Sequence, residues 1–281
     1  MPTLPYDPRV ASLLHPQAGE SFFKPGGHYD DVQLGVEASR LAYIRAEDRG
    51  AEFARLATTL RIAGFGQMEH FNLALGTQAF SAFRVADRTA LVAFRGTEIG
   101  ALQDIGIDAA ALVVPWEGAG QVHAGFAAAF AAIGDTIPAW IREKCGDCRL
   151  VLCGHSLGGA LAVLAASRWN AARLVTIGQP RVGDADFIAS LAGVDYTRLI
   201  NCCDLVPRLP PPSRGYAHGG TAHYITHAGT VLVNPHVDEV NNDRHLGRGQ
   251  YFEQFAGRAG NAPTRDVADH APVNYVRAVL P

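Results

Sequence analysis

The sequence has few of the features that mark nucleic-acid-binding or membrane-spanning proteins. Its 281 residues carry 24 Lys and Arg against 27 Asp and Glu, a net charge of −3, with no run of like charges. Nothing therefore indicates binding to nucleic acid or to an anionic membrane surface. The Ala-rich segment 124–133 is followed at once by Gly134 and Asp135, so no uninterrupted apolar run is long enough to span a bilayer.

The first ten residues also lack the pattern of a secretory signal. They contain several prolines and Asp7, where a signal peptide has a basic start followed by an apolar stretch. We therefore expect a soluble, cytoplasmic protein, or a secreted one if a leader has been removed.

Cysteine is scarce, and its odd count of five argues against a disulfide framework. Cys145 and Cys148 have the spacing of a redox pair or of half a zinc site, and Cys202 and Cys203 could supply the other half. Adjacent cysteines in a strand point to opposite faces, however, so free thiols are favoured. Cys153 is expected to be a small buried apolar residue. No metal or cofactor is expected.

A 48% share of hydrophobic residues is enough for a large core, and strand-like runs alternate with helical patterns. This alternation is typical of a parallel sheet with functional loops at the carboxyl ends of its strands. We predict one α/β domain over residues 1–281, with an irregular segment at 1–30. Expected strands are 79–85, 91–94, 150–153, 173–177 and 197–202, with a hairpin over 224–233. Expected helices are 31–47, 52–60, 184–191, a long one from 120 to 144 with a break near Pro138, and one beginning at Pro272.

Two segments carry weaker signals. Residues 98–118 are rich in apolar side chains and are expected to form either a helix packed on the sheet or a cover over an apolar site. Residues 234–265 are polar and are expected to be loops with a short helix near Phe252.

The most informative stretch is Gly154-His155-Ser156-Leu157-Gly158, which lies between an apolar run of strand length and a helical pattern. A serine on such a sharp strand-to-helix turn exposes its hydroxyl, and glycines two residues to either side leave room for the turn. The free N–H of Leu157 at the helix start can donate to a developing oxyanion. The alternative is an ordinary Gly-containing turn after a strand, so a base, an acid and a second donor must be found.

Three further positions fit those roles. Gly96 permits a turn that aims the N–H and hydroxyl of Thr97 inward, although an ordinary strand-ending loop is the alternative. Asp204 ends a predicted strand and precedes a proline-rich, rigid loop, which suits a carboxylate that orients an imidazole; the alternative is a solvated turn aspartate. His270 precedes a helix whose first turn holds Pro272, and the dipole of that helix favours the neutral ring that a general base requires.

Taken in order, these blocks resemble the class 3 lipases, the fungal-type triacylglycerol lipases and their relatives with an α/β-hydrolase fold. The resemblance covers most of the chain from about Asp31 onward. It implies that Ser156 is the nucleophile, Asp204 the orienting acid and His270 the base, with Thr97 and Leu157 forming the oxyanion hole. The matching blocks are 94–97 (Phe-Arg-Gly-Thr), 120–126 (Gly-Gln-Val-His-Ala-Gly-Phe), 154–159 (Gly-His-Ser-Leu-Gly-Gly), 178–183 (Gly-Gln-Pro-Arg-Val-Gly), 204–210 (Asp-Leu-Val-Pro-Arg-Leu-Pro) and 269–270 (Asp-His).

The sequence departs from the family in two respects. Where the family often has Asp-Trp-x-x-Asp, this chain has Asp104-Ile-Gly-Ile-Asp108 without the tryptophan, and it lacks the leader and disulfides of secreted fungal members. These departures concern the lid and activation at an oil–water interface, and they leave Ser156, Asp204 and His270 untouched.

The resemblance implies a serine ester hydrolase that cleaves acylglycerols or related acyl esters through an acyl-enzyme. Its expected partner is a lipid or small acyl-ester substrate, and no nucleic acid. The alternatives are a soluble carboxylesterase, a phospholipase A1, or a non-catalytic binding protein that keeps the hydrolase scaffold. A thiol-redox or zinc module at Cys145 and Cys148 is a further alternative.

Overall fold

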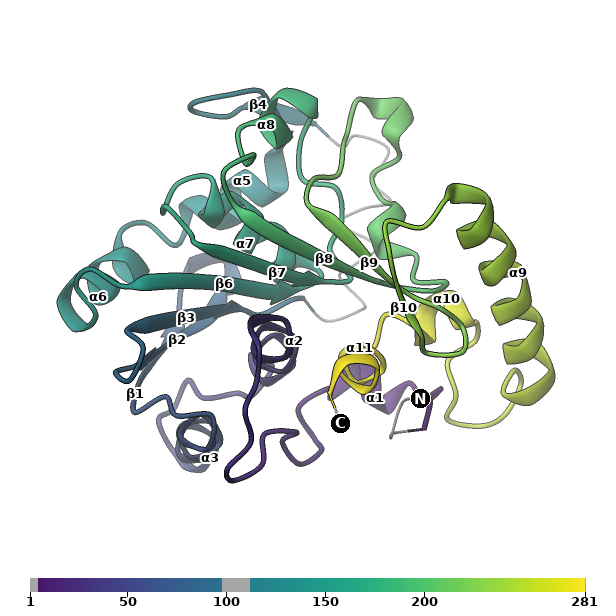
Figure 1. The fold of residues 1–281 in the computed structure, drawn as a ribbon, viewed down its shortest axis with the longest axis horizontal. Coiled ribbons are helices and arrows are strands. Elements are labelled where there is room, and N and C mark those ends of the chain that lie inside the picture. The colour runs from purple at the N-terminus through teal and green to yellow at the C-terminus, as the bar shows by residue number, and fades with distance from the viewer. Residues whose placement is uncertain (1–4, 98–111, 281) are drawn as a thin grey trace.

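An eight-stranded sheet runs through the centre of the computed structural model, which describes residues 5–97 and 112–280 (Figure 1). Its strands are β1 Gln67–Asn72, β2 Gln78–Arg84, β3 Thr89–Phe94, β6 Arg149–His155, β7 Arg173–Ile177, β8 Asp195–Asn201, β9 Thr221–Ile225 and β10 Val231–Val233. They lie in the order β1-β2-β3-β6-β7-β8-β9-β10. The strands from β3 to β9 are parallel, whereas β1, β2 and β10 join antiparallel at the two ends. The predicted α/β class with a mostly parallel sheet is confirmed.

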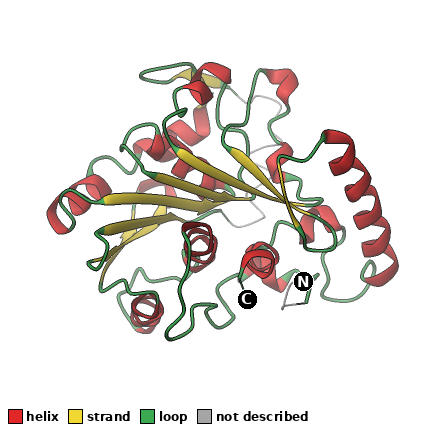
Figure 2. Cartoon of the chain, viewed as in Figure 1, coloured by secondary structure: helices red, strands yellow, loops and turns green. Residues whose placement is uncertain are grey.

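Helices cover both faces of this sheet (Figure 2). They are α1 Ala11–Leu14, α2 Asp31–Leu41, α3 Ala51–Ile62, α5 Ala124–Ala131, α6 Thr136–Lys144, α7 Leu157–Ala166, α8 Ala185–Ala189, α9 Val237–Gln254, α10 Arg265–Ala268 and α11 Pro272–Val279. In Figure 1, α2, α3 and α11 lie on one face, α5 and α7 lie on the other, and α9 stands beyond β10. Within the described residues, no single helix has both the length and the hydropathy to cross a membrane; α5 and α6 reach them only jointly, across a bend of 50°.

Each face of the sheet builds its own core, because successive strand residues point to opposite sides. In β6, Leu150 and Leu152 pack in the cluster with α5 and α7, whereas Val151 and Cys153 pack in the cluster with α2 and α11. A strand buried on both faces therefore reads as a continuous apolar run, which is why the sequence signal for it is strong. Cys153 is buried, as predicted, and burial raises the pKa of its thiol to about 12.

Two predicted helices differ from the observed ones. The first ends at Leu41 and not near residue 47. The predicted long helix from 120 to 144 is wrong: residues 121–123 form strand β5 (Gln121–His123), which pairs with β4 (Val113–Pro115), and α5 and α6 follow. The break falls at residues 132–135, where Gly134 has a positive φ of 54°, and not at Pro138. Pro138 lies in the first turn of α6, where helical N–H groups have no partner to lose.

Strand β1 was not predicted, and helix α9 is much longer than the short helix predicted near Phe252. Strand β1 lies at the sheet edge and buries only Phe71, so it has no apolar alternation. Residues 234–265 contain the 18-residue helix α9 in place of the predicted loops. The residues of α9 that are buried, Asp243, Gly247 and Tyr251, are spaced by four, which gives one face, but only Tyr251 is large and apolar.

The N-terminal segment 1–30, predicted to be irregular, contains the short helix α1 and packs against the C-terminal helix. The backbone N–H of Asp7 donates to Oδ1 of Asn274 in α11, and the amide of Asn274 donates to the carbonyl of Asp7. The segment that holds Asp104-Ile-Gly-Ile-Asp108, and most of the predicted cover 98–118, lies outside the described residues.

Candidate active site

Ser156 lies on the turn between β6 and α7, as predicted. Its backbone has φ 57° and ψ −126°, a left-handed region that costs a non-glycine residue roughly 1–3 kcal/mol. The N–H of Ser156 donates to the carbonyl of Ile177 at the end of β7, and its own carbonyl accepts the first helical bond of α7, from Ala160. The strain is therefore held by the neighbouring strand and by the helix that begins there.

The glycines on either side of the turn leave no room for a side chain. A Cβ at Gly154 would lie 2.2 Å from the carbonyl oxygen of Gly158, and one at Gly158 would lie 2.1 Å from the carbonyl oxygen of Phe94. Strand β3, strand β6 and helix α7 therefore meet in van der Waals contact beneath Ser156.

Asp204 and His270 form a buried pair. Nδ1 of His270 lies 2.8 Å from Oδ2 and 3.1 Å from Oδ1 of Asp204, and both side chains are almost fully buried. Asp204 follows β8, and its Oδ1 also accepts the N–H of Val206 from the turn that includes Pro207. A carboxylate on Nδ1 fixes the tautomer in which Nε2 can accept a proton.

The Ser156 turn lies beside this pair. Gly178 directly follows Ile177, the residue whose carbonyl bonds Ser156. A Cβ at Gly178 would lie 3.0 Å from Oδ2 of Asp204 and 3.1 Å from Nδ1 of His270. The structure thus brings the predicted residues Ser156, Asp204 and His270 together at the carboxyl ends of β6, β7 and β8.

His155 links the turn to His270 directly. Its ring centroid lies 4.4 Å from that of His270, and its Nε2 lies 2.9 Å from the carbonyl oxygen of His270. Oγ of Ser156 and Nε2 of His270 are both buried. Within residues 5–97 and 112–280 neither atom has a hydrogen-bond partner, and the two are not bonded to each other. These two atoms are thus free of competing hydrogen bonds in this part of the chain.

Thr97 and Leu157 border the same turn. Leu157 is the first residue of α7, so its N–H is one of the free donors at a helix start. Thr97 is half-buried and follows Gly96, where a Cβ would lie 3.3 Å from Cβ of Ser156. Both residues are thus adjacent to the serine, and residues 98–111 that follow Thr97 lie outside the described part of the chain.

Comparison with known proteins identifies this arrangement. A family model described as lipase (class 3) matches residues 91–214, a span that holds Thr97, Ser156 and Asp204. A lipase from Rhizomucor miehei is 35% identical over 122 residues, which cover 38% of this chain and 33% of that protein. Over these residues the chain is similar to the class 3 lipases. A lipase from Rhizopus niveus is 32% identical over 170 residues, which cover 54% of this chain and 42% of that protein.

Solved structures agree with the sequence match. The native propeptide complex of Rhizomucor miehei lipase superimposes with a TM-score of 0.59 at 25% identity, over 72% of this chain and 70% of that one. A triacylglycerol lipase whose catalytic centre is described as a serine protease triad gives a TM-score of 0.58 at 25% identity. The superposition covers 70% of this chain and 79% of that one. These neighbours establish the α/β-hydrolase fold. The sequence matches themselves span only 33% and 42% of the Rhizomucor and Rhizopus proteins.

Sequence reasoning missed Tyr275, which supports the carboxylate of Asp204. The Tyr275 hydroxyl donates to Oδ2 of Asp204 at 2.5 Å and accepts the backbone N–H of Asn201. Burial, followed by the charge of Asp204, raises the pKa of Tyr275 well above its usual range, so the hydroxyl keeps its proton. Its position five residues after His270 was the available signal that Tyr275 lies near the site. No local pattern predicts that its hydroxyl contacts the end of β8.

Tyr43 and His155 form a second support, also missed. The carbonyl of His270 can only accept, so Nε2 of His155 carries the hydrogen and Nδ1 accepts from the Tyr43 hydroxyl at 2.7 Å. Burial, followed by the neighbouring His270, lowers the pKa of His155 well below its usual value. The neutral ring of His155, at the end of β6, therefore links Tyr43, two residues beyond α2, to the backbone of His270.

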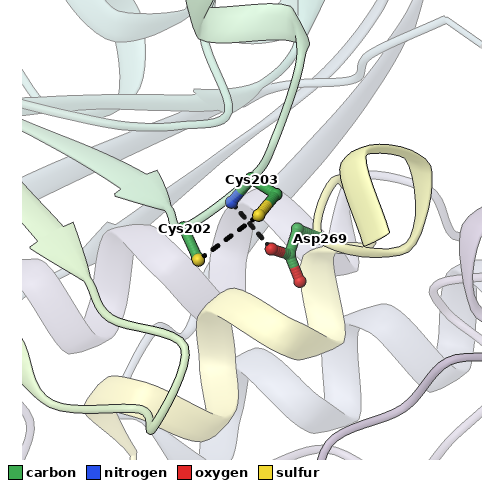
Figure 3. Close-up of side chains that lie close together, drawn as sticks. All are labelled: Cys202, Cys203 and Asp269. Carbon is green, nitrogen blue, oxygen red and sulfur yellow. Dashed lines mark hydrogen bonds between the residues drawn. The ribbon is translucent and has the colours of Figure 1, made fainter. Parts of the chain in front are cut away.

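The cysteines differ from the prediction in one respect. Cys202 and Cys203 do not lie in a strand with opposed side chains; they occupy the turn after β8, and their sulfurs are 3.5 Å apart. Their Sγ atoms and a carboxylate oxygen of Asp269 all lie within 4.8 Å of one another, the one such cluster in the described residues that could hold a metal (Figure 3). Cys145 and Cys148 are also free, and burial raises the pKa of Cys145 to about 12, which disfavours a reactive thiolate there.

Proposed function

We propose that the protein is a serine carboxylic-ester hydrolase of the lipase type, which cleaves acylglycerols or related acyl esters through an acyl-enzyme. The observation that carries the proposal is the buried pair of His270 and Asp204, 2.8 Å apart, beside the strained turn that presents Ser156. The order Ser, Asp, His along the chain agrees with the α/β-hydrolase plan.

In the first step, Nε2 of His270 takes the proton of Ser156 as Oγ attacks the ester carbonyl. The N–H of Leu157 and the donors of Thr97 stabilise the oxyanion. Asp204 holds the imidazolium in place through Nδ1. Collapse of the tetrahedral intermediate expels the alcohol, which receives its proton from His270, and leaves the acyl group on Ser156.

In the second step, His270 removes a proton from water as the water attacks the acyl-enzyme. The same donors hold the second oxyanion, and Ser156 leaves with the proton returned by His270. One ester and one water thus give one acid and one alcohol, and Ser156 and His270 return to their starting protonation states.

The relatives support an acylglycerol substrate and a location outside the cell. One relative, 35% identical over 114 residues, is named a secreted mono- and diacylglycerol lipase from Fusarium solani. That name favours secretion over the cytoplasmic location expected from the N-terminal residues. A hydrolysis series from short to long acyl esters, below and above their solubility limits, separates a lipase from a soluble carboxylesterase, and a phospholipid substrate tests phospholipase A1 activity.

The deciding experiment replaces the proposed nucleophile. We expect Ser156→Ala to lower kcat for a p-nitrophenyl ester by about 10⁴–10⁶-fold, because no other group can form the acyl-enzyme. Ser190→Ala is the matched control, since Ser190 caps α8 by donating to the carbonyl of Phe187 and lies outside the proposed machinery. Its kcat should equal that of the wild type.

An organophosphate then tests the role of Ser156 without turnover. Intact mass should show one phosphonyl group on the wild type and on Ser190→Ala, and none on Ser156→Ala. Full activity in Ser156→Ala, or a label on another residue, would refute the assignment. A wild type that neither hydrolyses esters nor takes the label would point to a non-catalytic binding protein.

A further inference from the structure

A compact cluster of metal-ligand side chains is formed by residues that directly precede Asp204 and His270 in the chain. Sγ of Cys202 and Sγ of Cys203, 3.5 Å apart, come from the turn after β8. The carboxylate of Asp269 comes from the turn between α10 and α11 and accepts the backbone N–H of Cys203 at 2.8 Å. All three side chains are buried, and Figure 3 shows them facing one another.

The spacing fits a tetrahedral ion with sulfur ligands. Two sulfurs that each lie about 2.3 Å from one zinc ion are about 3.8 Å apart at a tetrahedral angle. The sulfurs of Cys202 and Cys203 are already within a few tenths of an ångström of this spacing, at 3.5 Å. The carboxylate oxygen completes a set in which every pair lies within 4.8 Å.

Asp269 keeps capacity for a metal although it is hydrogen-bonded. Its Oδ2 accepts from Cys203 and from Nε of Arg265, whereas Oδ1 accepts from the hydroxyl of Tyr6. Oδ1 has one acceptor site left. Oδ2, which faces Cys203 in Figure 3, takes a metal in exchange for one of its two donors.

We propose that Cys202, Cys203 and Asp269 bind one thiophilic d¹⁰ cation, Zn²⁺ or Cd²⁺, with water in the fourth position. Soft thiolates select these ions over Mg²⁺ or Ca²⁺, which need more oxygen ligands. The site lies apart from Ser156, and the proposed ester hydrolysis does not use it.

Charge balance favours a doubly charged ion. Without metal both thiols are donors, Cys202 to Oδ2 of Asp243 and Cys203 to the carbonyl of Arg244. Hydrogen bonding with Cys203, together with burial, raises the pKa of Cys202, so the metal must displace a proton from each sulfur. One M²⁺ replaces two H⁺, forms two S–M bonds and adds no net charge to the buried cluster, in which Arg265 already balances Asp269.

A cavity provides a way in. It measures about 410 Å³ between α9 and α10, and its lining includes Arg248, Phe252 and Arg265. Arg265 forms the partition between the cavity and the cluster, since its Nε bonds Asp269 and its Nη1 bonds the carbonyl of Gly247 above Cys202. Arg265 thus contacts both the cavity and the cluster.

The test uses a chain from which the other thiol pair has been removed. Cys145→Ser/Cys148→Ser leaves Cys153, Cys202 and Cys203, and Cys153 is isolated within β6. Titration with Cd²⁺ should give the ultraviolet thiolate-to-cadmium band and, in native mass spectrometry, one Cd²⁺ per chain with the loss of two protons. The apparent affinity should rise about 100-fold per pH unit, because two protons are released.

Cys202→Ser/Cys203→Ser should lose at least about 100-fold in affinity, provided that its circular dichroism is native, because each lost thiolate removes a strong bond. If that variant does not fold, the first chain still decides. A folded Cys145→Ser/Cys148→Ser chain that forms no two-thiolate complex with stoichiometric Cd²⁺ would overturn the proposal. Equal binding by a folded Cys202→Ser/Cys203→Ser chain would do the same.

A second readout rests on the proposed function. Cys203 directly precedes Asp204, and Asp269 directly precedes His270. An ion bound to Cys203 and Asp269 therefore shifts the backbone next to both members of the pair. Saturating Cd²⁺ should slow ester hydrolysis by the Cys145→Ser/Cys148→Ser chain at least several-fold and leave a folded Cys202→Ser/Cys203→Ser chain unaffected. Binding without slowing would overturn this coupling, and an inactive wild type would overturn the proposed function while the binding test still stands.

Discussion

At the scale of single residues, the hydrogen bonds on Asp204 decide how firmly His270 is held. The carboxylate accepts from His270, from the N–H of Val206 and from the hydroxyl of Tyr275. A hydrogen bond to a charged group contributes about 1.5–3 kcal/mol, so each donor has a measurable effect on the pair.

Replacement of Tyr275 tests this support. We expect Tyr275→Phe to lower kcat about ten-fold with little change in KM, because a less fixed Asp204 holds the imidazolium poorly while substrate contacts stay intact. Steady-state kinetics with a p-nitrophenyl ester measures both constants. Tyr251→Phe is the control, since its hydroxyl donates to the carbonyl of Ala262 and not to Asp204. An unchanged kcat in Tyr275→Phe, or an equal loss in Tyr251→Phe, would contradict the role.

The sequence predicts some residues of the site and misses others for a physical reason. Ser156 and Leu157 are set by a local turn, and Asp204 and His270 by the ends of a strand and the start of a helix, so their surroundings are visible in the sequence. Tyr275 reaches Asp204 across 71 residues and Tyr43 reaches His155 across 112. Such contacts depend on how elements pack, which no local pattern records.

At the scale of elements, α9 has an unusual composition for its length. It is polar on nearly all sides, with Val237, Leu246 and Phe252 exposed and only one face buried. Two of its residues, Gly247 and Gly249, differ sharply in their surroundings. A Cβ at Gly247 would lie 3.0 Å from Sγ of Cys202, whereas nothing lies within 4 Å of one at Gly249.

This pair predicts unequal effects of the same substitution. We expect Gly249→Ala to stabilise the protein by about 0.8–1 kcal/mol, the usual gain when alanine replaces glycine inside an exposed helix. Gly247→Ala should gain no more than a fraction of this, because the added methyl group presses on Cys202, His227 and Arg265. Urea unfolding of both variants measures the free energies. Equal stabilisation by the two substitutions would show that α9 does not press on Cys202.

The elements that were predicted wrongly share a cause. Strand β1 and helix α9 lie at the edges of the fold and bury few apolar side chains, so hydrophobic periodicity is weak in both. The break between α5 and α6 was assigned to Pro138, but proline in a first helical turn begins a helix as readily as it ends one. Gly134, four residues earlier, takes the positive φ that stops α5.

At the scale of the whole molecule, the fold class is encoded in the strands that are buried on both faces. Residues 150–153 and 173–177 read as nearly continuous apolar or β-branched runs, and they form the centre of the parallel sheet. The order of the strands and the pairing of β9 with β8 could not be obtained in this way, because period and propensity do not specify neighbours.

The whole molecule should also lose stability in mild acid. Burial lowers the pKa of His155 and of His218 well below the ordinary histidine value. Below about pH 6.5 the unfolded chain binds protons that the folded chain does not. The free energy of unfolding therefore has its full value above that pH. It falls below that pH by up to about 1.4 kcal/mol per pH unit for each histidine.

His218→Gln isolates one of these protons. Nε2 of His218 donates to the carbonyl of Pro207, and a glutamine amide can keep a donor there without titrating. Urea unfolding between about pH 5 and 8 should give a dependence that is flatter by about one proton than in the wild type. The exposed His236→Gln serves as the control. A slope that His218→Gln leaves unchanged would assign the acid sensitivity to other groups.

The hydroxyl of Tyr6 bonds Asp269, the neighbour of His270, across 263 residues of chain. On a translating ribosome, at roughly 5–20 residues per second, the early segment must wait on the order of ten seconds to a minute before its partner is made. Until then this segment can form only local contacts, such as the bonds from Arg9 and Ser12 to Asp7. A nascent chain therefore cannot complete the surroundings of His270 during most of its synthesis, and the cell receives a competent site only when both ends of this span have emerged.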